Sequence, residues 1–184
     1  MSLSVLKKIC KLEDEDDLHL ARVLILIYFV TSFGKKPIAG ITKLVKLDFL
    51  LRYPKALERG LEYLEKSTDI INIKQYEVEN IESKMIRFKY GPWDTNYRTI
   101  LTILSSKNLI DIKEIKKTTY IELSSLGGSI SEKLILIDEF SDYVKRSRII
   151  KSNFSNLPAT KLKDLMYDLV PEIKNVKMGE DIVF

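Results

Sequence analysis

The segment from Ile41 to Tyr53 places the strongest constraint on the fold, because it leaves almost no polar face. As a helix it would carry apolar side chains around nearly its whole circumference, and a helix of that kind is buried. Asp48 is the acidic residue on this helix. Other elements must surround the segment, and a chain of 184 residues is long enough to supply them within one domain. The apolar positions are Leu44, Val45, Leu47, Phe49, Leu50 and Leu51.

Composition narrows the class of protein. Apolar residues make up 45% of the chain and charged residues 30%, as in ordinary globular proteins. The net charge of +4 permits contact with nucleic acid but falls short of a dedicated binder. Cys10 is the single cysteine and cannot form an internal disulfide, which favours a reducing compartment.

Neither membrane insertion nor secretion is expected from the N-terminal part. The apolar run from Val23 to Val30 is well short of the roughly 20 residues that span a bilayer. The acids between Glu13 and Asp17 interrupt any signal peptide. We therefore predict a cytoplasmic protein without a membrane partner.

Helical periodicity and cap residues predict a mainly helical chain. The first helix is expected over about 17–33, capped by Asp16 or Asp17 and ended by Gly34. The others are expected at Ile41 to Tyr53, from Pro54 through Leu64, from Asp94 or Thr95 to about Lys107, from Ser129 or Ser131 to about Ile150, and at Ala159 to Leu169.

Alternating apolar residues predict a few short strands. Lys84 to Tyr90 alternates as a half-buried strand, whereas Asp69 to Ser83 shows no sustained period. Ile110 and Ile112 on one side, and Ile121 and Leu123 on the other, indicate a hairpin whose turn lies around residues 116–118. The fold class expected is mainly α with a small β-sheet, an elaborated winged helix-turn-helix in which this hairpin is the wing. We assign 1–152 to that domain and 153–184 to a C-terminal short helix and tail.

Two motifs carry a family resemblance. They are the run from Ile41 to Pro54 and the run from Lys89 to Asp94, followed by Tyr97 and Arg98. With these motifs, residues 17 to 140 resemble the middle component of bacterial ABC-three-component systems, which include Lamassu-type anti-phage defence. The resemblance implies a non-catalytic adaptor between an SMC/Rad50-like ABC ATPase and an effector subunit, often a nuclease. No catalytic residue carries over from that family.

The motif residues leave two interpretations open. These residues either pack inside the fold as a family motif or contact a partner. They are Asp48, Arg52, Tyr53, Tyr90, Gly91, Pro92 and Trp93. A packed corner with Trp93 in the core is favoured over a partner-binding anchor. Asp48 and Arg52 are four residues apart on one helix and predict an ordinary ion pair worth a few tenths of a kcal/mol. Alternatively, the acid orients a neighbouring backbone group.

No pattern in the chain predicts catalysis, a metal or a cofactor. His19 is the single histidine and has no second ligand at a useful spacing. The acids at 13–17 are consecutive, which is not metal-ligand spacing. Gly127 and Gly128 lack the lysine and hydroxyl residue of a nucleotide loop.

The alternative function is a winged-helix DNA-binding transcriptional regulator, since such proteins place a helix in the major groove and the wing on phosphate. The helix before the hairpin offers only two cations, so its attraction for phosphate is thin. If the wing and a second basic group at the end of the 129–150 helix shared one surface, the chain could hold double-stranded DNA non-specifically inside an assembly. The candidate DNA-contacting residues are Arg98, Lys107, Lys113, Lys116, Lys117, Lys145, Arg146 and Arg148.

Overall fold

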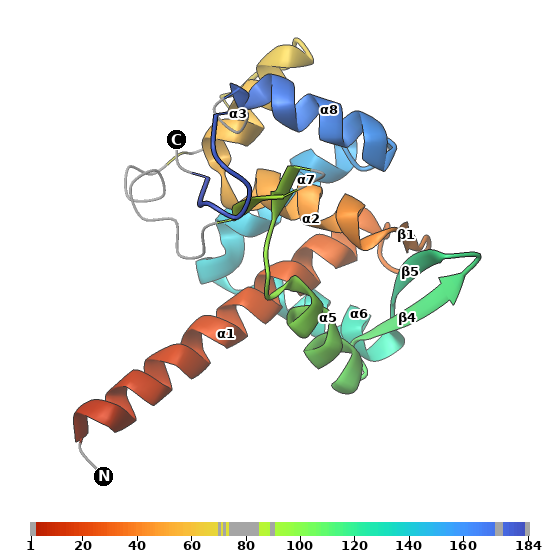
Figure 1. Ribbon diagram of the computed structural model, residues 1–184. Coiled ribbons are helices and arrows are strands. Elements are labelled where there is room, and N and C mark those ends of the chain that lie inside the picture. The colour runs from red at the N-terminus through yellow and green to blue at the C-terminus, as the bar shows by residue number, and fades with distance from the viewer. Residues whose placement is uncertain are drawn as a thin grey trace.

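The protein is mainly helical, with a small antiparallel sheet of three strands beside the helices (Figure 1). This computed structural model describes residues 3–69, 71, 73, 85–88, 91–171 and 175–182, with the backbone alone for 3–16, 88 and 91. Its core gathers apolar residues from every described α-helix except α6, whose Ile130 and Leu134 pack partly buried against it. The predicted mainly helical class with a small sheet is therefore confirmed.

The first helix, α1 (Leu3–Val30), begins well before the predicted position. The acids at 13–17, which were expected to precede and cap the helix, lie inside it. Aspartate is favoured at helix starts but is also tolerated inside a helix at a small cost, so the acidic cluster was no reliable start signal. The predicted break is correct: Ser32, Phe33 and Gly34 have φ of 55°, 64° and 82°, which ends the helix in a left-handed turn.

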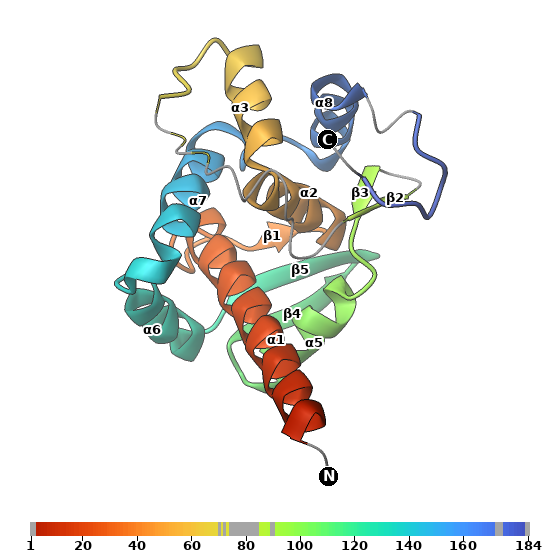
Figure 2. The same ribbon diagram turned by 90° about the vertical axis from the view of Figure 1, so that its left-hand side faces the viewer.

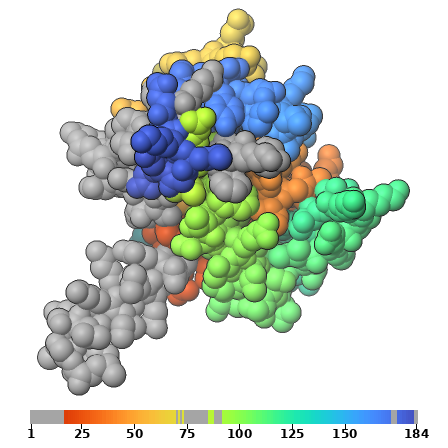
Figure 3. Space-filling view, in the orientation of Figure 1, coloured from red at the N-terminus to blue at the C-terminus, as the bar shows by residue number. Residues whose placement is uncertain are grey.

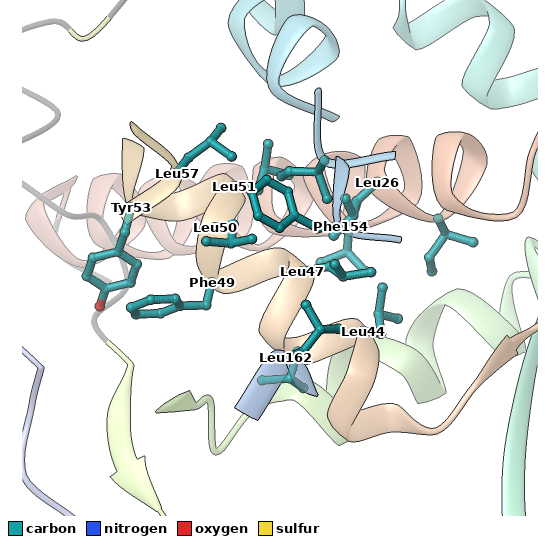
Figure 4. Close-up of a cluster of buried hydrophobic side chains, with 14 of the residues drawn as sticks. Leu26, Leu44, Leu47, Phe49, Leu50, Leu51, Tyr53, Leu57, Phe154 and Leu162 are labelled. Atoms are coloured by element: carbon teal, nitrogen blue, oxygen red, sulfur yellow. The ribbon is translucent and has the colours of Figure 1, made fainter. Parts of the chain in front are cut away.

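The second helix, α2 (Ile41–Arg52), lies at the centre of the molecule as its apolar circumference predicted. Every residue from 44 to 52 is buried. Figure 4 shows its side chains surrounded by Leu26 from α1, Phe154 after α7 and Leu162 from α8. The chain then turns at Tyr53, where Pro54 begins α3 (Pro54–Tyr63), so the predicted corner is also correct.

The hairpin forms at the predicted place. After α5 (Tyr97–Ser106), strands β4 (Ile110–Ile115) and β5 (Thr118–Leu123) pair antiparallel, with Ile112 opposite Ile121. The two-residue strand β1 (Ile38–Ala39) adds to the far side of β5, which gives the sheet order β1-β5-β4. The link between α1 and α2 is therefore fastened to the hairpin.

The helix expected from Ser129 or Ser131 to Ile150 is wrong as a single element. It is divided into α6 (Ser125–Leu134), a short 3-10 turn (Asp138–Phe140) and α7 (Ser141–Asn153). The apolar period continues through the break, so periodicity alone could not reveal it. Gly127 and Gly128 lie inside α6, and the hydroxyl of Ser124 caps it by accepting the Gly127 N–H at 2.9 Å.

The C-terminal part packs on the body. Helix α8 (Ala159–Leu169) matches the prediction and buries Leu162 and Met166 in the main core. Strands β2 (Ile86–Phe88) and β3 (Gly91–Trp93) form a separate hairpin. Residues expected to be an extended tail return to β2, where the Ile182 N–H donates to the Met85 carbonyl at 2.8 Å. The predicted strand is confirmed at 86–88, while Lys84, Lys89 and Tyr90 lie outside the described residues.

Candidate functional site

The helix before the hairpin exposes a polar, nearly uncharged face. On α5 the exposed side chains are Arg98, Thr99, Thr102 and Ser106, and Lys107 follows the helix, also exposed. The opposite face is apolar and buried through Ile100, Leu101 and Leu104. Arg98 and Lys107 are thus accessible as predicted, and they are the two cations that this surface offers.

The hairpin presents its cations unequally. Lys113 forms an exposed ion pair with Glu122, with 2.5 Å between its Nζ and the carboxylate oxygen. The hydrogen bond and charge of Glu122 raise the pKa of Lys113. Glu122 thus partly compensates its charge, and its role in DNA contact stays a prediction. Lys116 and Lys117 are exposed and have no such partner among the described residues.

The tip of the hairpin holds these two lysines in a left-handed conformation. They form the two-residue turn between Ile115 and Thr118, with φ of 48° and 66°. Turns of this kind favour asparagine and glycine because other side chains are strained at positive φ. The turn therefore places two charged side chains at strained positions of the backbone.

The second basic group does not join this surface. Figure 2 shows α7 and α6 on one side of α1, and α5 on the other. On α7, Lys145 and Arg148 are exposed, whereas Arg146 is 3% exposed. Assigning Arg146 to DNA contact was therefore wrong, since its side chain is buried in the fold. The Arg148 guanidinium lies 5.5 Å from the centre of the Phe29 ring, a cation–π contact.

A buried ionic network connects the two sequence motifs. Asp48 on α2 accepts from the Nε of Arg52 at 2.8 Å and from the Nε of Arg22 on α1 at 3.2 Å. The other end of the Arg52 guanidinium donates through Nη2 to Asp94 at 2.6 Å. All four residues are 8% exposed or less. The predicted pair of Asp48 and Arg52 forms, but as part of an interior network and not on an exposed helix face.

Two further polar side chains border this network. Burial and the charges of Arg22 and Arg52 lower the pKa of His19 to about 4. Burial, with the negative charge of Asp48, raises the pKa of Tyr97 well above its usual value. Both side chains are therefore neutral near pH 7. The Arg52 guanidinium is held charged: burial alone would lower its pKa, but Asp48 and Asp94 outweigh that effect and raise it.

The network gathers ionisable groups from distant segments, yet its arrangement is that of a structural cluster. Two arginines balance two aspartates, and each carboxylate already accepts from an arginine. Asp94 also accepts the Asn96 N–H at 2.8 Å through its other oxygen, which positions the start of α5. Reasoning from sequence missed Arg22 and Asp94 as members. The signal for Arg22 was an arginine directly before an apolar run, which needs a partner when buried, and Asp48 inside an apolar helix was the matching acid; Asp94 gave no such signal.

The remaining motif residues are mostly interior. Tyr53 is 1% exposed, stacks on Phe49 with 4.5 Å between ring centres and accepts the Met85 N–H at 2.8 Å. Burial raises its pKa to about 12. Pro92 is buried, and Trp93 is partly buried against the core, as the packed-corner interpretation expected. Contact of Asp48, Arg52 or Tyr53 with a partner is thus excluded in this conformation; Tyr90 is not among the described residues.

Other classes of site find no support in the described part of the chain. It holds no group of three or more histidine, cysteine or acidic side chains placed to bind a metal. Among these residues, no helix combines the length and apolar character needed to cross a membrane. Comparison of the chain with family models, curated proteins and solved structures gave no match.

Proposed function

We propose that this chain is a non-catalytic accessory subunit with a winged-helix body, which links an SMC/Rad50-like ABC ATPase to an effector in an anti-phage defence complex and contributes weak contact to DNA. The order α1-β1-α2-α5-β4-β5, with the sheet order β1-β5-β4, supports the winged-helix assignment. In this view α3, β2 and β3 are an insertion before α5. The proposed role beside an ATPase depends on the motifs at 41–54 and 89–98.

The observation that carries the choice between adaptor and regulator is the exposed face of α5. Sequence is read by side chains that reach base edges, whereas contacts to phosphate hold the protein in position without reading sequence. On α5 the single exposed cation is Arg98, beside Thr99, Thr102 and Ser106, while the uncompensated lysines lie at the tip of the hairpin. This distribution favours weak contact to the DNA backbone over selective recognition.

Non-catalytic action is part of the same proposal. The acids with an interior position, Asp48 and Asp94, are committed to arginines, and His19 is neutral beside two positive charges. None of these groups is placed to exchange protons with a substrate near neutral pH.

Two measurements on the purified chain test this function. Size-exclusion chromatography with a coiled-coil ATPase encoded beside it should give a stable complex. Gel-shift titration with several unrelated duplexes at physiological salt should give similar, weak affinities, in the range of about 10⁻⁴ to 10⁻⁶ M for non-specific binding. Failure to bind the ATPase would reject the adaptor role.

The second candidate is a sequence-specific regulator, favoured by the polar side chains that α5 exposes, which are of types that can contact base edges. That function predicts nanomolar binding to one duplex, at least about 10³-fold tighter than to the others. The same gel-shift titration decides between the two functions.

A further inference from the structure

A polar hollow lies where the α1–β1 turn, the start of α2 and the segment after α7 meet. Its volume is about 190 Å³, far above the roughly 10–15 Å³ that one water molecule requires. Two segments far apart in sequence build it, since residues 30–43 form one wall and Ser155 and Asn156 the other. The lining residues are Val30, Ser32, Lys36, Pro37, Ile38, Lys43, Ser155 and Asn156.

The polar residues around this hollow include two cations and several groups that can donate hydrogen bonds. Lys36 and Lys43 supply ammonium groups, and Ser32 and Asn156 supply a hydroxyl and an amide. No aspartate or glutamate of the described chain lines the hollow. Within the described ranges, neither lysine forms an ion pair. The hollow therefore has an excess of positive charge and donors that the protein does not neutralise locally.

The local backbone increases this excess. Lys43 lies in the first turn of α2, where the helix dipole is positive and where no acidic residue is present. A cation at this end of a helix is unfavourable, and a nearby anion would remove that penalty. Burial lowers the pKa of Lys43, and an anion beside the ammonium group would raise it again.

The wall formed by the α1–β1 turn is held in one shape. The Thr31 hydroxyl donates to the Ile27 carbonyl at 2.8 Å and accepts the Gly34 N–H at 3.0 Å. Phe33 packs edge-on against Tyr28. The Lys151 ammonium lies 4.5 Å from the centre of the Phe33 ring. Ser155, one helical turn after Lys151, lines the hollow and donates its hydroxyl to the Lys151 carbonyl. The backbone of this wall is thus fixed before any ligand arrives.

We propose that this hollow binds a phosphate group through Lys36, Lys43, Ser32 and Asn156. The phosphate belongs either to the backbone of duplex DNA or to a free phosphate or nucleotide. The duplex source rests on the DNA contact proposed above, whereas the free source does not depend on it.

The position of the hollow suits a second contact to a duplex held by the wing. Ile38, which lines the hollow, pairs with Ile121 of β5. Figure 3 shows the segment that leads into α2 beside the hairpin on one face of the molecule. A phosphate bound here and one bound at the hairpin tip would lie on neighbouring parts of the protein.

The first test is a titration of the ¹⁵N-labelled chain with inorganic phosphate, followed by NMR. Binding predicts saturable shifts of the amide signals of Ser32, Lys36 and Lys43. These shifts should disappear in Lys36→Gln and Lys43→Gln but persist in Lys35→Gln, which removes a neighbouring exposed cation that does not line the hollow. Lys36→Gln changes an exposed side chain, so its result stands even if the half-buried Lys43 affects folding.

The second test measures duplex affinity at several salt concentrations. If the hollow holds a backbone phosphate, Lys36→Gln/Lys43→Gln should lower the salt slope by about 0.9 for each phosphate that the variant no longer neutralises. If the ligand is free phosphate or a nucleotide, the slope stays unchanged while the NMR shifts persist in the wild type. Absence of both effects overturns the site. A wild-type chain that binds no duplex at all rejects the DNA contact, and the NMR titration then decides the free-phosphate site by itself.

Discussion

Arg52 joins two parts of the chain 42 residues apart, because its Nη2 lies 2.6 Å from Asp94 while its Nε bonds to Asp48. Asp94 in turn positions the start of α5 through the Asn96 N–H. The central helix and the helix beside the hairpin are therefore connected by one guanidinium group. Their relative position depends on charges in the interior of the protein.

Replacing Asp48 with asparagine should strongly destabilise the fold. The change leaves Arg22 and Arg52 buried with one carboxylate between them, and breaking a buried pair typically costs about 3–5 kcal/mol. Urea unfolding of Asp48→Asn measures the loss. Asp164→Asn is the control, since it breaks an exposed pair with Lys163 and should change stability by less than about 1 kcal/mol. Equal stability of the two variants would contradict the structural role of the network.

His19 should make the folded state less stable as the pH falls from about 6.5 to about 4. Burial and the nearby arginines lower its pKa to about 4 in the folded state, so the unfolded chain binds more protons in this interval. Its contribution to stability is present above pH 6.5 and is lost on acidification. Urea midpoints measured across this range should fall less in His19→Gln than in the wild type. Parallel curves would show that the histidine does not titrate differently on unfolding.

Gly127 and Gly128 should respond oppositely to alanine. A Cβ on Gly127 would lie 2.0 Å from the Leu109 carbonyl oxygen, so Gly127→Ala must displace backbone and should cost at least about 2 kcal/mol. A Cβ on Gly128 meets only a Leu123 side chain at 3.9 Å. Because alanine favours a helix, Gly128→Ala should stabilise the protein by about 0.5–1 kcal/mol. Thermal unfolding of both variants checks this, and destabilisation by both would contradict the close approach.

Two double variants at Lys116 and Lys117 separate the effect of backbone strain on stability from the effect of charge on duplex binding. Lys116→Asn/Lys117→Gly should raise stability by about 1 kcal/mol, since both residues tolerate positive φ, and should weaken duplex binding. Lys116→Gln/Lys117→Gln should weaken binding equally without the gain in stability. The salt slope should fall by up to about 1.8 in both, because each variant leaves two phosphates without a cation.

Variants on α7 are the matched control for the wing. Lys145→Gln/Arg148→Gln removes two exposed cations on the other side of α1, away from α5, and should leave the salt slope unchanged. A reduced slope in this variant would place the duplex on the α7 face instead.

The sequence was sufficient to predict those elements whose signals lie within the element itself. The corner at Tyr53, the hairpin after Leu109 and helix α8 follow from proline position, alternation and helical period. The points where helices begin and end were harder to predict. The acids at 13–17 suited a cap but lie within α1, and the apolar period across Ile135 to Ile137 concealed the break between α6 and α7. In both cases an interior helix position and a terminus have the same residue types.

The interior network could be predicted only in part. The spacing of Asp48 and Arg52 indicates a pair, because both lie on one helix. Its other members, Arg22 and Asp94, come from segments 26 and 42 residues away and meet it only through tertiary packing. Arg146 gave the opposite error, since a basic residue near a helix end suggested exposure but is buried between neighbours on α7.

The return of the chain to strand β2 has a consequence for biosynthesis. Leu162 and Met166 fill the core around α2, and Ile182 is fully buried after bonding to Met85. A nascent chain that has emerged only as far as α7 would expose this apolar helix surface to the ribosome exit and to chaperones. The native core therefore cannot close before the residues of α8 and Ile182 have left the exit tunnel.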